Sequence, residues 1–448
     1  MSTNETVGSL RPLLELSGEN LKKALEEFTV ADLADMWYEL DSEEALKIFL
    51  ALDQDTRGEL MAELPPSGQR ELVEALSEQA TKDLLEVMDP DDVVDLIQSV
   101  PPEVRQEVLG HMDEETRKET EFLLRFEDDA AAGLMTPRYI AVREDITVGQ
   151  ALEFLRKAPE EIETIYYIYV VDNLQRLRGV VSLRQLLLSD DNKKISEIME
   201  RNVISVLADT DQEETAKVLE DHDLIALPVV DRWNRLLGIV TFDDMIDVIR
   251  EEQSEDVYRM NAIGGEAEDY LESPVSRLIW RRLPWIVLLL LAGTITTNVL
   301  AGYEHLIAQF AFLALFIPVI TQTGGNSGTQ SSTLMIRGLA TGNLHFGVIG
   351  KVLTKEIATG MVIGIVTGLV IFLRSVFLPP GIMFKEAVVV AVSLNAVVLF
   401  ATIMGCLVPF LIDKFGGDPA VAAGPLMSTL IDVTGLTIYF EITKLLLT

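Results

Sequence analysis

Cysteine and histidine are scarce in this sequence: 448 residues include one cysteine, Cys406, and four histidines. A single cysteine excludes a disulfide framework within the chain, so a soluble part is compatible with the cytosol. Residues 1–8 are polar, and we expect no signal peptide there. The histidines are scattered, and neither a P-loop nor a Ser-His-Asp set occurs, so the sequence gives no support for an enzyme.

Basic residues are scarce in residues 1–273, which hold 26 Lys and Arg against 64 Asp and Glu, a net charge of −38. Residues 274–448 carry 10 basic and 7 acidic residues, a net charge of +3. A part this acidic repels nucleic acid and anionic lipid, and it attracts divalent cations. We therefore expect no nucleic-acid partner. The alternative for most of these carboxylates is a solvated surface that aids solubility.

Charged residues are scarce after residue 274. Uncharged runs occupy 283–303, 306–336, 357–373 and 387–412, and residues 419–440 are interrupted only by Asp432. About 20 apolar residues cross a membrane as a helix. We therefore predict a pore domain of five transmembrane helices at 274–448, in the cell inner or plasma membrane. With the N-terminus cytoplasmic, seven Lys or Arg lie at inner ends and three at outer ends, so the C-terminus is expected outside.

Asp432 is an isolated carboxylate at membrane depth, where a charge costs roughly 2.5 kcal/mol or more. Such a group persists where water, a bundle interior or a cation receives it, so Asp432 indicates a cation pathway. The segment 324–332, GGNSGTQSS, adds polar side chains and helix-loosening glycines after an apolar run. We predict that this segment lines or supports a pore; hydrogen bonding between helices is the alternative. Pro318 and Pro409 are expected to kink their helices and free carbonyl groups.

Residues 1–130 contain a repeat with a period of 12. Apolar residues recur every 12 positions from Leu40 to Leu124, and most are followed by Asp, Ser or Pro. An apolar residue followed by one of these is typical of a helix start. Each repeat therefore predicts one short helix, and such helices must stack into an acidic α-solenoid to bury their apolar faces.

A second repeat has an offset of 59 residues. Tyr-Val-Val-Asp at 169–172 and Gly-Val-Val-Ser at 179–182 recur as Pro-Val-Val-Asp at 228–231 and Gly-Ile-Val-Thr at 238–241. Each copy therefore reads as two strands joined by a turn and followed by a helix that begins with Ser or Thr. This order resembles the α/β CBS-domain pair, which would occupy residues 131–250. Such pairs often bind adenosine nucleotides, which implies a possible ATP site at Thr241 and Asp244. Gln185 takes the place of the aspartate in the first copy, which weakens that inference there.

An acidic connecting, or plug, helix and linker is predicted at 251–273, between this pair and the first span. Asp244, Asp247, Glu251 and Glu255 are spaced to share one helix face, where like charges repel. The run is either a solvated linker or a surface that cations or a partner neutralise. Its place before the first span favours the second interpretation.

The order of solenoid, CBS pair, acidic helix and five spans resembles the MgtE family of magnesium channels over essentially the whole chain. The most specific segments are 324–334 (GGNSGTQSSTL), 418–419 (DP) and 429–435 (TLIDVTG). The resemblance implies a homodimer in lipid with the pore at the subunit interface, where Asp432 holds a hydrated Mg²⁺. It also implies regulatory Mg²⁺ ligands at Glu59, Asp91, Asp95, Glu213, Asp223, Asp244, Asp247, Glu252, Glu255, Asp256 and Asp418.

Mg²⁺ prefers oxygen ligands and loses its water reluctantly, which suits one carboxylate holding a hydrated ion. Cytosolic Mg²⁺ at the regulatory carboxylates is expected to close the pore, and its loss lets their repulsion open it. Three alternatives stay open: a transporter of another divalent cation such as Co²⁺ or Mn²⁺, a CBS-regulated transporter of an anion or osmolyte, and a membrane-tethered nucleotide-sensing enzyme. The acidic charge within the spans disfavours the second, and the absent catalytic motifs disfavour the third.

Overall fold

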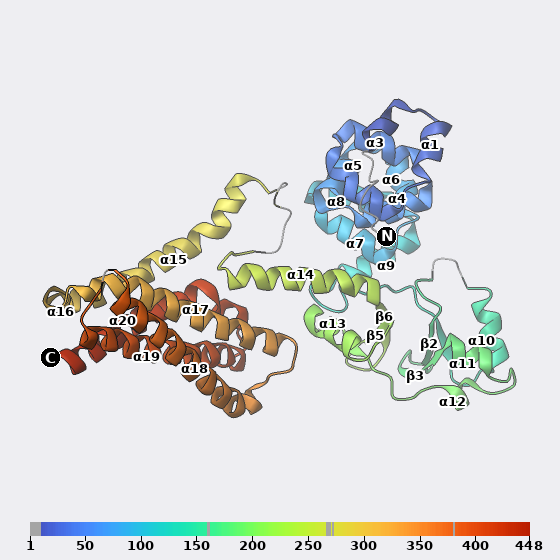
Figure 1. Cartoon of the computed structure of the whole chain (residues 1–448). Coiled ribbons are helices and arrows are strands. Elements are labelled where there is room, and N and C mark those ends of the chain that lie inside the picture. Colours follow the sequence, from blue (N-terminus) through green and yellow to red (C-terminus); the bar gives the residue numbers. More distant parts are fainter. Residues whose placement is uncertain (1–9, 159–161, 266–269, 271–272, 380) are drawn as a thin grey trace. The chain divides into compact units, whose positions relative to one another are not determined.

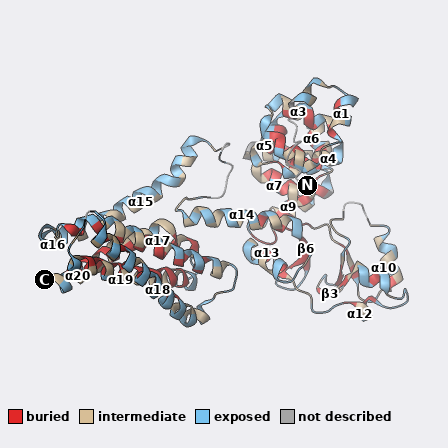
Figure 2. Cartoon of the chain, in the orientation of Figure 1, coloured by how far each residue is buried: buried red, intermediate tan, exposed pale blue. Residues whose placement is uncertain are grey.

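The computed structural model describes residues 10–158, 162–265, 270, 273–379 and 381–448 (Figure 1). The chain divides into two compact units, Met1–Arg250 and Glu251–Thr448. Buried apolar residues gather within each unit (Figure 2).

The first unit opens with short helices. Seven of them, α3 to α9, begin at residues 42, 54, 66, 78, 90, 102 and 114, so the predicted 12-residue period is present. The elements are η1 (Arg11–Glu15), α1 (Glu19–Leu25), α2 (Val30–Met36), η2 (Trp37–Glu39), α3 (Ser42–Ala51), α4 (Gln54–Glu63), α5 (Pro66–Ala75), α6 (Glu78–Leu85), α7 (Pro90–Ser99), α8 (Pro102–His111) and α9 (Glu114–Leu123).

The residues at the repeat boundaries explain why these helices start where they do. The side chains of Asp41, Asp53 and Ser77 accept hydrogen bonds from backbone amides of the first turn that follows. Pro66 and Pro90 occupy first helical positions, where a missing amide hydrogen costs nothing. Helices two apart along the chain then contact each other, which buries the apolar residues that a single short helix leaves exposed.

Two three-stranded sheets follow, each with the strand order of the chain. The first contains β1 (Ala141–Arg143), β2 (Tyr167–Val171) and β3 (Leu177–Ser182), and the second contains β4 (Val206–Leu207), β5 (Ala226–Val230) and β6 (Leu236–Thr241). In each sheet the first pair of strands is parallel and the second is antiparallel. Val170 pairs with Gly179 and Val229 with Gly238, so the 59-residue repeat of the sequence is also a repeat of strand register.

Reciprocal hydrogen bonds join the two copies. The amide of Leu177 donates to the carbonyl of Asn234 (2.9 Å), and the amide of Leu236 donates to the carbonyl of Gln175 (3.0 Å). Buried residues of both sheets share one core, which includes Tyr169 and Ile239. The helices of this part are α10 (Val148–Leu155), α11 (Leu183–Leu188), α12 (Ile195–Ile198), α13 (Gln212–Asp221) and α14 (Phe242–Met260).

Helix α14 is the acidic helix of the sequence analysis, and it begins earlier than expected. It starts at Phe242, directly after strand β6, and continues without a break to Met260. No glycine or proline interrupts residues 242–260, so nothing ends the helix at the predicted boundary of 251. The division between the two compact units therefore falls within one helix.

The second unit is helical. Its elements are α15 (Val275–Gly302), α16 (Glu304–Gln309), α17 (Phe312–Ala340), η3 (Phe346–Val348), α18 (Ile349–Phe377), α19 (Phe384–Lys414), η4 (Pro419–Ala422) and α20 (Gly424–Leu447). Among the described residues, four helical stretches are long and apolar enough to cross a membrane: Val275–Gly302, Phe346–Phe377, Phe384–Lys414 and Pro419–Leu447. Helix α17 has 29 residues but carries the polar segment 324–332, and it is not among the four.

The predicted run 306–336 is divided between two helices. Helix α16 ends at Gln309, and α17 begins at Phe312. The expectation of a loosened backbone at 324–332 is wrong, because this segment lies inside the continuous helix α17. Pro318 and Pro409 also lie inside helices, α17 and α19, which continue on both sides of them.

Candidate functional site

Glycines let helix α17 approach its neighbours closely. A β-carbon at Gly324 would lie 2.7 Å from Val397 of α19 and 2.8 Å from Ile431 of α20. A β-carbon at Gly405 of α19 would lie 2.3 Å from the carbonyl oxygen of Gly328. A real side chain never tolerates such separations, so these positions require glycine while the helices keep this packing.

Serine hydroxyls of the same α17 segment bridge to other elements. Ser327 shares a 3.1 Å hydrogen bond with the hydroxyl of Thr402 on α19. Ser331 donates toward the carbonyl of Thr402 (3.1 Å), and Ser332 donates to the carbonyl of Ala422 in η4 (3.3 Å). Hydrogen bonding between elements, the alternative in the sequence analysis, thus accounts for these three serines.

Asp432 lies on α20 beside the buried Ile431 and is itself partly exposed. The buried face of α20 continues through Gly435 and Leu436. Among the residues that the structure describes, none forms an ion pair with the Asp432 carboxylate. An oxygen ligand of this kind, at the edge of a packed helix face, is available to a cation that approaches from the exposed side.

Sequence reasoning missed a second carboxylate in this unit, Glu356 of α18. Its side chain is buried, with 9% exposed, and accepts a 2.6 Å hydrogen bond from the hydroxyl of Ser331. Glu356 adjoins Lys355, so it falls just outside the uncharged run 357–373. A signal was present: Glu356, Gly360, Gly364 and Gly368 are spaced by four, and all are buried on one face of α18.

Acidic residues meet an arginine where α14 ends. Arg259 donates hydrogen bonds to both Asp418 and Glu255. The other oxygen of Asp418 accepts from the amide of Ala420 (2.7 Å), which starts η4. Burial, followed by repulsion from Asp418 and Glu252, raises the pKa of Asp256. Four predicted ligands, Glu252, Glu255, Asp256 and Asp418, are therefore brought together, with Arg259 among them.

The start of α20 fits against the end of α14. Gly424 has a positive φ of 47°, and a β-carbon there would lie 2.4 Å from the carbonyl oxygen of Met260. Both facts favour glycine at this position. A cavity of about 790 Å³ adjoins the contact and is lined by Glu255, Arg259, Arg281, Trp285 and Asp418, among others.

A second acidic group occurs in the first unit, and we call it the acidic junction: Asp89, Asp91, Asp92, Glu163 and Asp244. These residues come from the start of α7, the segment before β2 and the start of α14. Arg138 lies beside them and pairs with Asp89 at 2.7 Å. Asp89, Asp92 and Glu163 were not among the predicted ligands, because no local sequence pattern links the three segments that carry these carboxylates.

Burial sets the electrostatics of the acidic junction. Burial, followed by repulsion from neighbouring carboxylates, raises the pKa of Asp92 and of Glu163 to about 7. Burial is also the main cause that raises the pKa of Asp244 to about 6 and that of Asp91 well above its usual range. One buried oxygen of Asp91 has no hydrogen-bond partner among the described residues. These groups favour a proton or a bound cation over an unpaired negative charge.

The remaining predicted ligands are dispersed. Glu59, Glu213 and Asp223 are exposed, and Asp247 is exposed and pairs with Arg250 at 3.1 Å. Asp95 is exposed and acts electrostatically on Asp92. Across the part of the chain that the structure describes, no three acidic, histidine or cysteine side chains converge closely enough to hold a metal ion.

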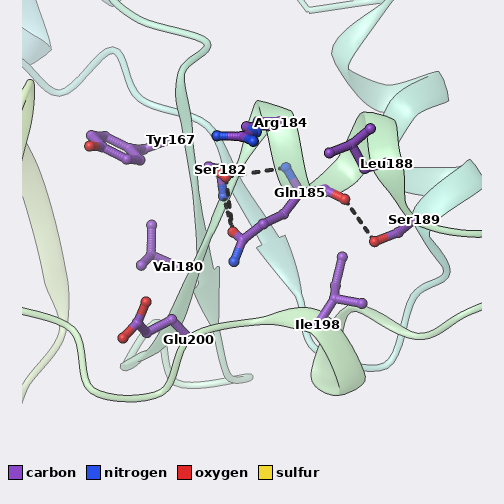
Figure 3. A pocket seen from close by; sticks show the side chains of 9 residues that line it. All are labelled: Tyr167, Val180, Ser182, Arg184, Gln185, Leu188, Ser189, Ile198 and Glu200. Carbon is purple, nitrogen blue, oxygen red and sulfur yellow. Dashed lines mark hydrogen bonds between the residues drawn. The ribbon is translucent and has the colours of Figure 1, made fainter.

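A cavity of about 600 Å³ opens on the first CBS copy (Figure 3). Tyr167, Arg184, Ser182 and Glu200 line it, with apolar side chains between them. Gln185 points to Ser182 and accepts hydrogen bonds from the Ser182 amide (2.8 Å) and hydroxyl (3.0 Å). In the second copy, Thr241 donates to Asp244 (2.5 Å), and Asp244 belongs to the acidic junction.

Comparisons with known proteins agree with this organisation. A family described as divalent cation transporter matches residues 317–442, the MgtE intracellular N domain matches 28–129, and CBS domains match 131–190 and 195–251. The chain is 44% identical over 341 residues to a magnesium transporter MgtE of Thermus thermophilus, covering 75% of this chain and 74% of the relative. It is 39% identical over 335 residues to one from Enterococcus faecalis, covering 74% and 72%.

A solved structure is similar to about half of this chain. It is the cytosolic domain of the Mg²⁺ channel MgtE in complex with ATP, with 42% identity and a TM-score of 0.53. The match covers 54% of this chain and all of that one. By these family matches and by its identity to relatives over about three quarters of their length, the chain belongs to the MgtE family of magnesium transporters.

Proposed function

We propose that this protein carries Mg²⁺ across the cell membrane, with Asp432 as the carboxylate that holds the hydrated ion. The observation that carries the proposal is a partly exposed carboxylate, without a basic partner among the described residues, on a helix that has no other charged residue from Gly424 to Phe440. Magnesium transport by the relatives supports the choice of ion. Outer-shell contacts to one carboxylate suit Mg²⁺, which keeps several of its waters.

The proposed membrane arrangement has five spans: α15, α17, α18, α19 and α20. Helix α17 is included because its 29 residues measure about 43 Å at 1.5 Å per residue, and its polar segment packs against α19 and α20. An odd number of spans places the two termini on opposite sides of the membrane, and the excess of basic residues at one set of helix ends places the N-terminus in the cytoplasm and the C-terminus outside.

We assign the pore to a homodimer. Helix α15 has no buried side chain within the single chain, although it has 28 residues. Its surface is therefore available to lipid or to a second subunit. In the proposed dimer, helices α17 and α20 of each subunit, together with Asp432, line the ion pathway at the subunit interface.

We further propose that cytosolic Mg²⁺ regulates this pathway. Helices α3 to α9 form the proposed solenoid, and the acidic junction and the α14 residues supply regulatory ligands. Buried carboxylates with raised pKa values repel one another when they are ionised, and a divalent cation removes that repulsion. Mg²⁺ then favours the closed arrangement because it binds that arrangement more tightly.

Arg259 has a defined place in this regulation. Its guanidinium contacts Asp418 and Glu255, two of the proposed Mg²⁺ ligands. In the absence of Mg²⁺ this arginine holds the end of α14 against the loop before α20. The Arg259 guanidinium is thus a covalently attached cation that competes with free Mg²⁺ for the carboxylates of Asp418 and Glu255.

ATP is the proposed nucleotide ligand, and we place it in the cavity of the first CBS copy. Tyr167 offers an aromatic ring and Arg184 a guanidinium, which suit a base and a phosphate respectively. The ATP complex of the similar cytosolic domain supports the choice of ligand. Thr241 and Asp244, proposed from the second motif, compete with this assignment.

Replacing Asp432 by Ala is expected to reduce Mg²⁺ flux into proteoliposomes to background, because the pathway loses its ion-holding carboxylate. Asp432→Asn should fall between Asp432→Ala and the original chain. Asp413→Ala, at the exposed end of α19, is the control and should transport normally. Parallel measurements with Co²⁺ and Mn²⁺ define selectivity; Mg²⁺-selective flux at the original rate in Asp432→Ala would reject the pore assignment.

The two nucleotide sites can be separated by calorimetry on the full-length protein. Arg184→Ala should abolish the ATP binding heat, whereas Asp244→Ala should retain it. Arg232→Ala, an exposed arginine paired with Asp209, serves as the control. Loss of binding in Asp244→Ala with retention in Arg184→Ala would move the nucleotide to the second copy.

The acidic junction predicts a pH dependence of stability without divalent cations. Asp92 and Glu163 have usual pKa values of 3.8 and 4.5, and both are raised to about 7 in the folded protein. The folded state therefore binds more protons than the unfolded state between these values, so stability falls as pH rises from about 4 through 7. The thermal midpoint of the first unit in the full-length protein should drop between pH 5 and 7.5.

The double variant Asp92→Asn, Glu163→Gln should reduce this slope, because it removes the two titrations. Glu74→Gln, at an exposed position of α5, should leave the slope unchanged. Mg²⁺ should raise the midpoint at pH 7.5 more than at pH 5. A midpoint that rises from pH 5 to 7.5 in chelator would contradict the prediction.

Arg259→Gln should raise Mg²⁺ flux when internal Mg²⁺ is well below millimolar, because the tethered cation no longer holds α14 to Asp418. At several millimolar internal Mg²⁺ the variant should close as the original chain does, so its Mg²⁺ dependence becomes steeper. Arg117→Gln, which removes an exposed pair with Glu121 on α9, is the control. Lower flux in Arg259→Gln at low Mg²⁺ would exclude this role.

A further inference from the structure

Glu356 is a buried carboxylate to which the proposed transport assigns no task. It lies seven residues into α18, about 10 Å from the start of that helix at 1.5 Å per residue. Only 9% of the residue is exposed. Carboxylates in such surroundings are costly and are retained where they have a function.

The partner of Glu356 is Ser331 of α17. The 2.6 Å separation between the Ser331 hydroxyl and Glu356 is within the range of charge-assisted O–H···O⁻ bonds. The same hydroxyl lies 3.1 Å from the carbonyl oxygen of Thr402 on α19. A hydroxyl has one proton to donate, so the carboxylate and the carbonyl compete for it, and the shorter contact favours Glu356.

The helices pack closely around Glu356, and no set of metal-ligating side chains surrounds it among the described residues. A β-carbon at Gly360, one turn further along α18, would lie 3.0 Å from Thr402. A β-carbon at Gly405 would lie 2.9 Å from that of Ser331. No group of three metal-ligating side chains was found among the described residues. Glu356 is therefore placed to act on Ser331 rather than on a bound cation.

Helix α17 depends on hydroxyl contacts for its rotational position. Its glycine positions present backbone to α19 and α20 and allow close approach, but a glycine has no side chain to form a directional bond. Ser327, Ser331 and Ser332 supply the directional contacts. Of these, Ser332 reaches Ala422 in the short helix that Asp418 caps, and Ser331 supplies the bond to α18.

We propose that Glu356 is a positioning residue for ion passage: through Ser331 it fixes the rotation of α17, and with it the α17 face that packs against α20 near Asp432. The inference rests on the proposed transport function. It assigns to Glu356 a hydrogen-bond acceptor role, which an amide oxygen reproduces and a methyl group does not.

The test measures Mg²⁺ and Ca²⁺ flux in proteoliposomes for Glu356→Ala, Glu356→Gln, Ser331→Ala and the double alanine variant. Glu356→Ala should lower Mg²⁺ flux by about tenfold or more and reduce the Mg²⁺-to-Ca²⁺ flux ratio, because a bond to a charged group is lost. Glu356→Gln should retain most of the Mg²⁺ flux and most of the Mg²⁺-to-Ca²⁺ flux ratio of the original chain. The double variant should resemble Glu356→Ala alone, because both changes break the same contact.

Controls separate positioning from folding and from the transport proposal itself. Glu304→Ala, an exposed carboxylate of α16, should leave flux and selectivity unchanged. Thermal midpoints in detergent identify variants that fail to fold. If Glu356→Ala fails to fold, the flux and selectivity of Glu356→Gln are compared with those of the original chain instead. Flux and selectivity of Glu356→Ala like those of the original chain would overturn the inference, as would a Gln variant that folds but is impaired as severely as Ala. Absence of Mg²⁺ flux in the original chain would instead reject the transport function.

Discussion

The contact of α17 with α19 and α20 is the constraint on which the second unit depends. Apolar helices in lipid gain little from hiding apolar surface from one another, so they associate through close packing and directional bonds. Gly324 and Gly405 allow the helices to approach so closely that an added β-carbon would lie 2.7 Å and 2.3 Å from its nearest neighbour. That approach brings the serines of α17 within hydrogen-bond reach of Thr402, Glu356 and Ala422.

The polar segment of α17 therefore has a structural explanation that does not require unwound backbone. In the sequence, glycines among Asn, Ser, Thr and Gln indicate a loosened helix, because each glycine weakens an isolated helix by about 1 kcal/mol. In the structure, packing of α17 against its neighbouring helices offsets this loss of helix stability. The same residues then serve packing and, in the proposed function, the pathway beside Asp432.

The repeats were predictable from the sequence because their signals are local. Each 12-residue unit carries its own apolar and capping residues, as at Leu52 and Asp53, and each CBS copy carries its own strand pair and helix start. Contacts between distant segments left no such signal. Asp92 and Glu163 are 71 positions apart, and Arg259 and Asp418 are 159 apart, so neither pairing follows from spacing.

The two CBS copies show how one pattern acquires two environments. Ser182 with Gln185 and Thr241 with Asp244 occupy equivalent positions and make similar helix-start hydrogen bonds. Gln185 lines an open cavity, whereas Asp244 is held among the carboxylates of the acidic junction. The local repeat determines the hydrogen bond, and the surrounding elements determine whether the site faces a cavity or other charges.

The net charge of the acidic part overstates the force available for regulation. Exposed carboxylates such as Asp55 and Glu59 are screened by salt over about 8 Å at physiological ionic strength, so distant pairs contribute little. Buried carboxylates are screened far less, and their pKa values are raised first by burial and then by repulsion from neighbouring carboxylates. In the proposed regulation, a divalent cation therefore acts mainly at these few buried positions. For that reason Asp92 and Glu163, which carry no recognisable motif, matter more to the proposed regulation than the many acidic residues that produce the overall charge.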